Sequence, residues 1–305
     1  MMKHMKWAAL ALVLLLAFAA LAAAEDMNTG DASLDNPRNA DGIGPDELLV
    51  VSFGTSFNDS RRLTIGAIED AMEKAFPQWQ VRRALTSQII LDHVRERDGE
   101  EMDNVHAALE RSVKNGVRRL VVQPTHLMDG FEYHELMDQL SAYADAFDRL
   151  EVGRPLLDTA QDMESVARII TDATQEFVDG KTAVVFMGHG TEAASNQVYA
   201  QMQQVLRDQG AADRFVGTVE AEPSLEDVLS LVKDGGYTRV VMRPLMVVAG
   251  DHAHNDMAGE EPDSWKSRFE AEGLETVCVL EGLGELEAIR QLYVRHAEEA
   301  VEKLK

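Results

Sequence analysis

Three stretches of the sequence decide the fold: VVFMGHGT at 184–191, VGTVEAEP at 216–223 and VVAGDHAHND at 247–256. Each contains or follows a run of apolar, largely β-branched residues, and each is interrupted by glycine or proline. Such runs predict strands that are covered on both faces, and the glycines and prolines mark where the strands end. In open α/β folds, ligands bind beside the carboxyl ends of the strands. These stretches therefore predict an α/β fold and the place of its functional site.

The same alternation of strands and helices extends outward over most of the chain. Apolar runs predict six strands, at 48–53, 118–123, 182–187, 215–220, 239–248 and 275–280. Helices are predicted between several of them, for example at 193–209, and a last helix is predicted at 286–305. Strands that alternate with helices indicate βαβ units and parallel sheets.

Two pairs of segments in the two halves of the chain resemble each other. VVSFGTS at 50–56 matches VVFMGHG at 184–190, and RLVVQPTHL at 119–127 matches RVVMRPLMV at 239–247. We therefore predict two similar α/β domains, parallel sheets flanked by helices, at 46–165 and 166–305. The alternative is chance, since short valine-rich strands recur in α/β proteins. Because ligands favour clefts between domains, we expect the site in a cleft between these two.

The first 24 residues have the pattern of a secretory signal peptide. Lys3 and Lys6 precede an apolar stretch at 7–21, and three alanines follow at 22–24. A basic segment, an apolar segment and a small-residue cleavage site predict export to the periplasm with cleavage near Ala24. A retained membrane anchor is the competing interpretation, but the apolar stretch is short for a bilayer span.

Composition narrows the class of protein. Residues 25–45 are rich in Asp, Asn, Gly and Pro and predict a flexible tether between the signal peptide and the first domain. The chain has 305 residues with a formal net charge of −24 and no cluster of Lys and Arg, which argues against nucleic acid as a partner. Cys278 is the only cysteine, so no intrachain disulfide forms, and its strand-like surroundings indicate a core residue.

The predicted strand ends carry the candidate metal ligands. His189 lies between two glycines, which let the backbone turn and leave the imidazole accessible. Glu220 ends an apolar run and needs a partner or a cation, although Glu222 could take its place. His252 and His254 are two residues apart, so on an extended segment both could face one site, or one of them could support the other from behind the metal ligands. Two imidazoles and a carboxylate form a site for a borderline divalent metal.

Other residues are candidates for contacts with a substrate. FGTSF at 53–57 offers Thr55 and Ser56 and backbone N–H groups just before a predicted helix, which suits an anionic group. His126 follows another predicted strand and would face the same cleft. Asp251 is a candidate to orient one of the metal-binding imidazoles, as carboxylates commonly do. The chain has neither a P-loop nor a dinucleotide-binding glycine motif, which disfavours nucleotide binding.

These motifs together resemble the anaerobic-type sirohydrochlorin cobaltochelatases of the class II chelatase, or ferrochelatase-like, superfamily. The resemblance rests on GHGT, TVE and MVVAGDHAHNDMAG before DSWK, with FGTSF, QPTHLMDGFEY and DNVHAALE in the first half, and it covers the chain from about Glu47 onward. It implies two similar α/β domains that insert Co(II) into sirohydrochlorin without nucleotide hydrolysis. Carried over by motif, the metal-binding and catalytic residues are His189, Glu220 and His252. Apart from the motif, His254 is our candidate for a contact with the tetrapyrrole.

Two further hypotheses accompany the chelatase. One is an exported haem or metallotetrapyrrole carrier derived from a chelatase. Its haem ligand would be His93, His106 or His134, which are expected on the surface of helices, and the haem could lie at an interface between identical subunits. The bland interpretation of these three is exposed helical histidine. The other is a metal-dependent hydrolase, because such ligand sets also activate water.

Overall fold

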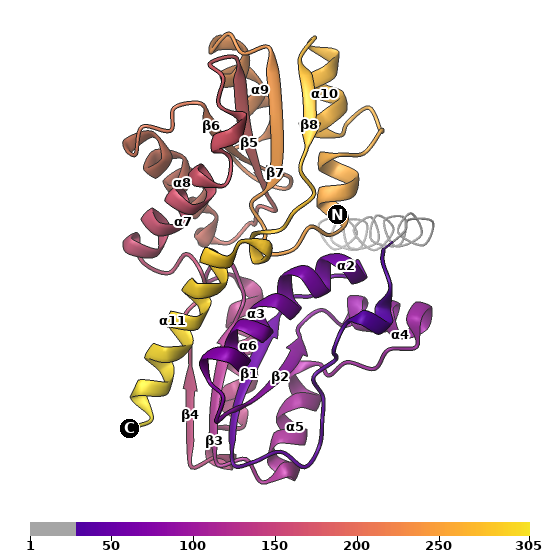
Figure 1. Ribbon diagram of the computed structural model, residues 1–305, viewed down its shortest axis with the longest axis vertical. Helices are drawn as coiled ribbons and strands as arrows, with labels where there is room; N and C mark the ends of the chain where they lie inside the picture. The colour runs from indigo at the N-terminus through magenta and orange to yellow at the C-terminus, as the bar shows by residue number, and fades with distance from the viewer. Residues whose placement is uncertain (1–28) are drawn as a thin grey trace, which may run out of the picture.

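The computed structural model describes residues 29–305, so the predicted signal peptide at 1–24 lies outside the described residues. Two four-stranded sheets dominate this part of the chain, and every pair of neighbouring strands is parallel. Figure 1 shows one domain around each sheet, the first drawn indigo to magenta and the second red to orange. Among residues 29–305, no helix combines the length and the apolar character that crossing a bilayer requires.

Both sheets have the same strand order, which is the structural form of the repeat seen in the sequence. The first has the order β2-β1-β3-β4 and the second the order β6-β5-β7-β8. The strands are β1 Asp46–Ser52, β2 Gln80–Leu85, β3 Arg119–Pro124, β4 Arg149–Val152, β5 Thr182–Gly188, β6 Arg214–Thr218, β7 Arg239–Pro244 and β8 Glu275–Cys278. Pro124 and Pro244 end the third strand of each sheet. This confirms the prediction of two similar α/β domains with parallel sheets.

The apolar runs predict all four central strands, β1, β3, β5 and β7, together with the edge strands β6 and β8. All seven residues of β5 are buried, and in β1 only Asp46 is partly exposed, as expected for strands covered by helices on both faces. The longer α-helices are α3 Ala67–Ala75, α4 Gln88–Asp98, α5 Val105–Asn115, α6 Phe131–Ala142, α7 Ala160–Asp172, α8 Gln197–Asp208, α9 Leu225–Asp234, α10 Trp265–Ala271 and α11 Glu287–Lys303. Short elements complete the described chain: the 3-10 turns Ala32–Leu34, Ala144–Ala146, Gln175–Phe177, Ala194–Asn196 and Leu283–Glu285, α2 Asn58–Arg61, and the π-helices Arg62–Gly66 and Ala253–Met257.

Two strands were not predicted, and each has a physical reason. Strand β2 has the sequence QVRRAL, in which Arg82 and Arg83 interrupt the apolar pattern, yet both side chains are fully buried. They are buried because each pairs with acidic groups: Arg82 with Glu47 and Asp103, and Arg83 with Glu69 and Asp35. Strand β4 is an edge strand of four residues, RLEV, too short to give a periodic signal.

Residues 29–45 are held against the first domain, in contrast to the flexible tether that their composition predicts. Asp35 forms ion pairs with the buried Arg61 and Arg83, at 2.7 and 2.6 Å. Arg38 is only 6 % exposed and pairs with the fully buried Glu69 at 3.0 Å. Polar residues in this segment therefore serve as partners for buried charges, which a composition rule does not detect.

The C-terminal helix joins the two domains. Figure 1 shows α11, in yellow, lying along the first domain, and it contacts α3, β3, β4 and α7. The Tyr293 hydroxyl donates a hydrogen bond to the Thr125 carbonyl at 2.8 Å. The two sheets lie on either side of the predicted domain boundary at residue 165, which itself falls within α7, and that boundary stays a prediction.

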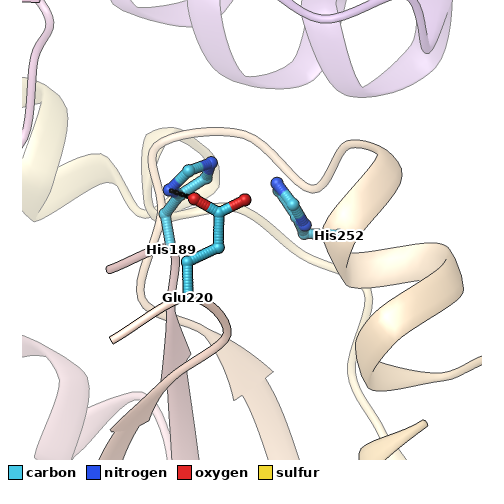
Figure 2. A group of neighbouring side chains, drawn as sticks. All are labelled: His189, Glu220 and His252. Atoms are coloured by element: carbon cyan, nitrogen blue, oxygen red, sulfur yellow. Dashed lines mark ion pairs between the residues drawn. The ribbon is translucent and has the colours of Figure 1, made fainter. Parts of the chain in front are cut away.

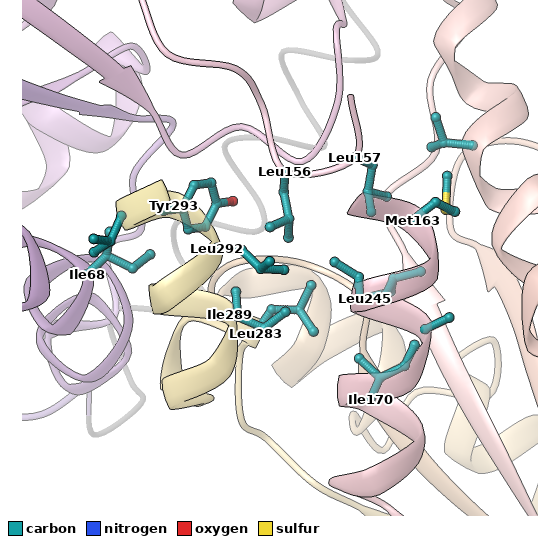
Figure 3. Packing of buried hydrophobic residues seen from close by; sticks show 14 of the residues in the cluster. Ile68, Leu156, Leu157, Met163, Ile170, Leu245, Leu283, Ile289, Leu292 and Tyr293 are labelled. Atoms are coloured by element: carbon teal, nitrogen blue, oxygen red, sulfur yellow. The ribbon is translucent and has the colours of Figure 1, made fainter. Parts of the chain in front are cut away.

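The largest hydrophobic cluster also spans both domains. It contains Leu48 and Val121 from the first sheet, Val184 and Phe186 from the second, and Tyr293 from α11. Figure 3 shows the part of this cluster in which α11 packs against α7 and the loops between them. Burial of this shared core fixes the two domains relative to each other.

Candidate metal site

Three side chains from separate strand ends converge in the second domain. His189 directly follows β5, Glu220 lies two residues beyond β6, and His252 lies just before the π-helix that follows β7. One ligand atom from each lies within 4.8 Å of the others. Figure 2 shows both imidazoles beside the Glu220 carboxylate. The structure thus brings together the three residues that the sequence predicts to bind metal.

The GHG turn accounts for the position of His189. A side chain at position 188 would place Cβ 2.1 Å from the Tyr199 ring, so only glycine fits there. Gly190 has a φ of +88°, which L-residues rarely adopt, and its Cα faces the Ala221 backbone. The turn continues the pairing of β5 with β6, because the Glu220 N–H donates to the His189 carbonyl at 2.9 Å. This backbone hydrogen bond places His189 and Glu220 side by side.

Hydrogen bonds indicate which ring nitrogen carries the proton in each of the two imidazoles. His189 Nδ1 lies 2.8 Å from the Gly190 carbonyl, and His252 Nδ1 lies 2.7 Å from Asp256 Oδ2. A carbonyl only accepts, so we assign the proton of neutral His189 to Nδ1; the Asp256 carboxylate likewise favours a proton on His252 Nδ1. Each neutral ring then keeps a lone pair on Nε2. A carboxylate or carbonyl on the second ring nitrogen is the usual support of a metal-binding histidine.

The charges around His252 favour a cation. Burial alone would lower the pKa of His252, but Asp256, Glu220 and Asp251 raise it above its ordinary value. Burial raises the pKa of Asp251, which accepts a hydrogen bond from the Asn255 amide. A group of acids around two imidazoles suits a divalent ion of the Co(II), Fe(II), Ni(II) or Zn(II) kind, and three protein ligands leave coordination positions open.

Two details of the predicted site differ in the structure. The orienting carboxylate is that of Asp256, not Asp251, because residues 251–257 are helical and not extended. Asp256 lies four residues after His252, the spacing at which side chains meet on a helix, so a helical interpretation of the segment would have found it. Glu222, the alternative to Glu220, lies outside the cluster and accepts a hydrogen bond from the Ser224 N–H.

The helical geometry also separates His254 from His252. The His254 ring stacks on Phe57 of the first domain, with centroids 4.2 Å apart and an interplanar angle of 8°. The expectation that both imidazoles face one site from an extended segment is therefore wrong. The predicted contact of His254 with a tetrapyrrole stays a prediction.

The other predicted substrate residues lie at the carboxyl edge of the first sheet. Thr55 is 3 % exposed and sits next to Gly250, because a Cβ at position 250 would lie 3.0 Å from Thr55 Oγ1. The Ser56 carbonyl accepts a hydrogen bond from Arg97 at 2.7 Å. The carboxyl edges of the two sheets therefore face each other at this point. The contacts of Thr55 and Ser56 with a substrate stay predictions.

His126 lies two residues beyond β3 and is half-buried as a residue. Both ring nitrogens are buried and have no hydrogen-bond partner in the described part of the chain. Burial lowers the pKa of His126 to about 4, against a weak opposing effect of Glu132. Its ring lies edge-on to Tyr133, with centroids 6.4 Å apart. The predicted contact of His126 with the tetrapyrrole is not tested by this geometry.

The low pKa of His126 predicts acid sensitivity. In the unfolded chain this histidine has a pKa near 6.5. Above that pH it costs no stability. As the pH falls from 6.5 toward about 4, the free energy of unfolding decreases, because the unfolded chain binds a proton that folded His126 does not. At pH 5 this effect should lower the free energy of unfolding by ~2 kcal/mol relative to pH 7.5. We expect His126→Phe to reduce the fall in unfolding free energy between these pH values by that amount in urea titrations. An unchanged pH dependence in His126→Phe would contradict this assignment.

The three candidate haem ligands occupy different environments. His93 on α4 is 6 % exposed, so the expectation of a surface position is wrong for this residue. His106 on α5 is exposed and lies 3.8 Å from Glu110, and His134 on α6 is exposed and lies 2.8 Å from Asp129. For these two the surface position is confirmed, and haem ligation stays a prediction.

Comparison with known proteins places this geometry in a family. The sequence model described as cobalt chelatase (CbiK) matches residues 46–302. The sirohydrochlorin cobaltochelatase of Salmonella typhimurium is 36 % identical over 254 residues, 83 % of this chain and 96 % of that protein. Sirohydrochlorin cobaltochelatase CbiKC of Nitratidesulfovibrio vulgaris is 32 % identical over 259 residues, 84 % of this chain and 91 % of that protein.

A solved structure has the same fold. SirB from Bacillus subtilis with Fe³⁺ aligns with a TM-score of 0.59 and 13 % identity, and the match covers 86 % of this chain and 98 % of that chain. At this identity the likeness concerns the fold alone. It agrees with a fold of two α/β domains with parallel sheets.

Proposed function

The chain belongs to the cobalt chelatase (CbiK) family, and from this premise we propose that it inserts Co(II) into sirohydrochlorin without nucleotide hydrolysis. One observation carries the proposal beyond the family: His189, Glu220 and His252 offer ligand atoms within 4.8 Å of one another. The three side chains lie at the edge of the second sheet that faces the first domain.

The residues suit the chemistry of metal insertion. Co(II) is the incoming substrate, held by two imidazoles and one carboxylate, none of which binds as tightly as a thiolate cage would. As the tetrapyrrole nitrogens form bonds to the ion, the bonds from the protein break, and two pyrrole N–H protons must leave the ring. Each imidazole released from the ion then has a lone pair free to accept a proton. A histidine pKa near neutrality suits that exchange.

The activity is tested by mixing the purified full chain with sirohydrochlorin and Co(II) in the absence of ATP. We expect the absorption spectrum of the tetrapyrrole to change to that of the cobalt complex faster than in a protein-free reaction. Equal rates with and without protein would contradict the proposal. Hydrolysis of esters or phosphates without any tetrapyrrole would instead favour the metal-dependent hydrolase.

We also propose that the chelatase is exported. The support is the basic, apolar and alanine-rich pattern of residues 1–24. N-terminal sequencing of the protein from a periplasmic fraction should find a first residue near Glu25. A protein that keeps Met1 and stays with the membrane fraction would favour the retained anchor.

A further inference from the structure

The π-helix that follows His252 is contacted directly by the first domain. The π-helix spans Ala253–Met257, and its His254 ring lies parallel to the Phe57 ring at 4.2 Å. Phe57 is 3 % exposed and His254 is half-buried, so the stack lies at the edge of the packed interior. Stacked aromatic pairs contribute beyond the area they bury, and they fix the relative orientation of two rings.

Two more contacts join the same segments. The Ala249 N–H donates to the Ser60 hydroxyl oxygen at 3.0 Å. Gly250 approaches Thr55 so closely that a Cβ there would lie 3.0 Å from Oγ1. Residues 55–60 of the first domain therefore hold residues 249–254 of the second at three successive points, and His252 lies within that span.

The first-domain side of this contact is rigid. Arg61, which is 1 % exposed, donates to the Thr55 carbonyl at 3.0 Å and to the Asn58 side chain at 2.6 Å. Arg97 donates to the Ser56 carbonyl at 2.7 Å. Hydrogen bonds from charged donors in a buried setting are strong, so the segment 55–60 is a fixed support.

The three metal ligands differ in how they are held. His189 and Glu220 sit on turns that are bonded to each other within the second domain. His252 is adjacent to residues that the first domain contacts, namely Gly250 and His254. On the second-domain side, Ala253 and Met257 are buried in the core of that domain. The position of His252 relative to the other two ligands therefore depends on both domains.

We propose that Phe57 and His254 are positioning residues for the metal site: their stack lets the first domain hold His252 in register with His189 and Glu220. The metal site is then complete only while the two domains are in contact at this point. This inference rests on the proposed function, because it assumes that the three residues bind the substrate metal. It assigns the His254 ring a packing role, which a phenyl ring can also perform.

The test is Co(II) binding to the full chain without tetrapyrrole, followed by the visible absorption of the bound ion. We expect His254→Ala to raise the Kd for Co(II) about tenfold, in the range seen when groups supporting a ligand are removed. His254→Phe keeps a flat ring against Phe57 and should stay within about threefold of wild type. Ser60→Ala removes an independent contact and should raise the Kd about threefold.

The outcomes separate this inference from the proposed function. An unchanged Kd in His254→Ala, or equal weakening in His254→Phe and His254→Ala, would overturn the stacking role. Loss of Co(II) binding in His189→Ala supports the metal site itself. Unchanged binding in His189→Ala would overturn both that site and the inference. Should His254→Ala fail to fold, His254→Phe and Ser60→Ala still decide the matter.

Discussion

His189→Ala should lower the rate of cobalt insertion by about two orders of magnitude or more. The substitution removes one of the three ligands and one of the two imidazoles that can accept a pyrrole proton. Loss of a positioned acid–base group alone costs typically about 10²–10⁴-fold in rate. The rate is measured from the spectral change of sirohydrochlorin at saturating Co(II), so that weaker metal binding and slower transfer are distinguished.

The fold should survive this substitution. The His189 side chain is 47 % exposed, and its hydrogen bond is to the adjacent carbonyl, so the unfolding free energy should change by less than about 1 kcal/mol. His106→Ala is the matched control, because it removes an exposed imidazole far along the chain from the site, on α5. Insertion at the wild-type rate in His189→Ala, with His106→Ala equally active, would remove His189 from the mechanism.

The candidate site could be predicted from the sequence because parallel strands end at one edge of a sheet. GHG, TVE and GDH follow three strands and are each about thirty residues apart in sequence. In the sheet, however, β5 lies directly between β6 and β7. The sequence pattern alone predicts that the strand ends meet. The resemblance to a chelatase family selected one acid, Glu220, over Glu222.

The parts that could not be predicted depend on local geometry. His254 and Asp256 follow His252 in a segment whose polar residues indicate neither strand nor helix. Only the observed π-helix turns Asp256 toward His252 and His254 toward Phe57. Whether this segment is helical or extended decides which of its side chains lie on the same face. Sequence patterns do not distinguish the two conformations over so short a segment.

Buried charges explain why the sequence did not predict strand β2 or the packing of residues 29–45. A strand with two adjacent arginines, and a segment rich in Asp and Asn, both look solvent-exposed as isolated sequences. In the structure, Arg83 of β2 and Asp35 of the N-terminal segment satisfy each other at 2.6 Å. A buried charge needs an opposite charge beside it, and each of these two residues supplies that partner for the other. The pairing cannot be recognised from either segment alone, because it depends on the two segments lying in contact.

Glu69→Gln should destabilise the first domain by about 3–5 kcal/mol, the cost of breaking a buried ion pair from one side. Glu69 is fully buried and binds Arg83 through both oxygens, at 2.8 and 2.7 Å, with Arg38 at 3.0 Å. Burial alone would lower the pKa of Arg83, but Glu69 and Asp35 raise it, so the arginine stays charged. With a neutral amide at position 69, the buried Arg83 charge would keep only Asp35 as an acidic partner.

The measurement is the unfolding free energy from urea titration at neutral pH. Glu73→Gln is the matched control: Glu73 pairs with the same Arg38 but is 47 % exposed, so its loss should cost less than about 1 kcal/mol. Since Asp35 and Arg38 connect residues 29–45 to this cluster, Glu69→Gln should also expose that segment to proteolysis, whereas Glu73→Gln should not. Equal stability of the two variants would mean that the buried charges do not hold the segment in place.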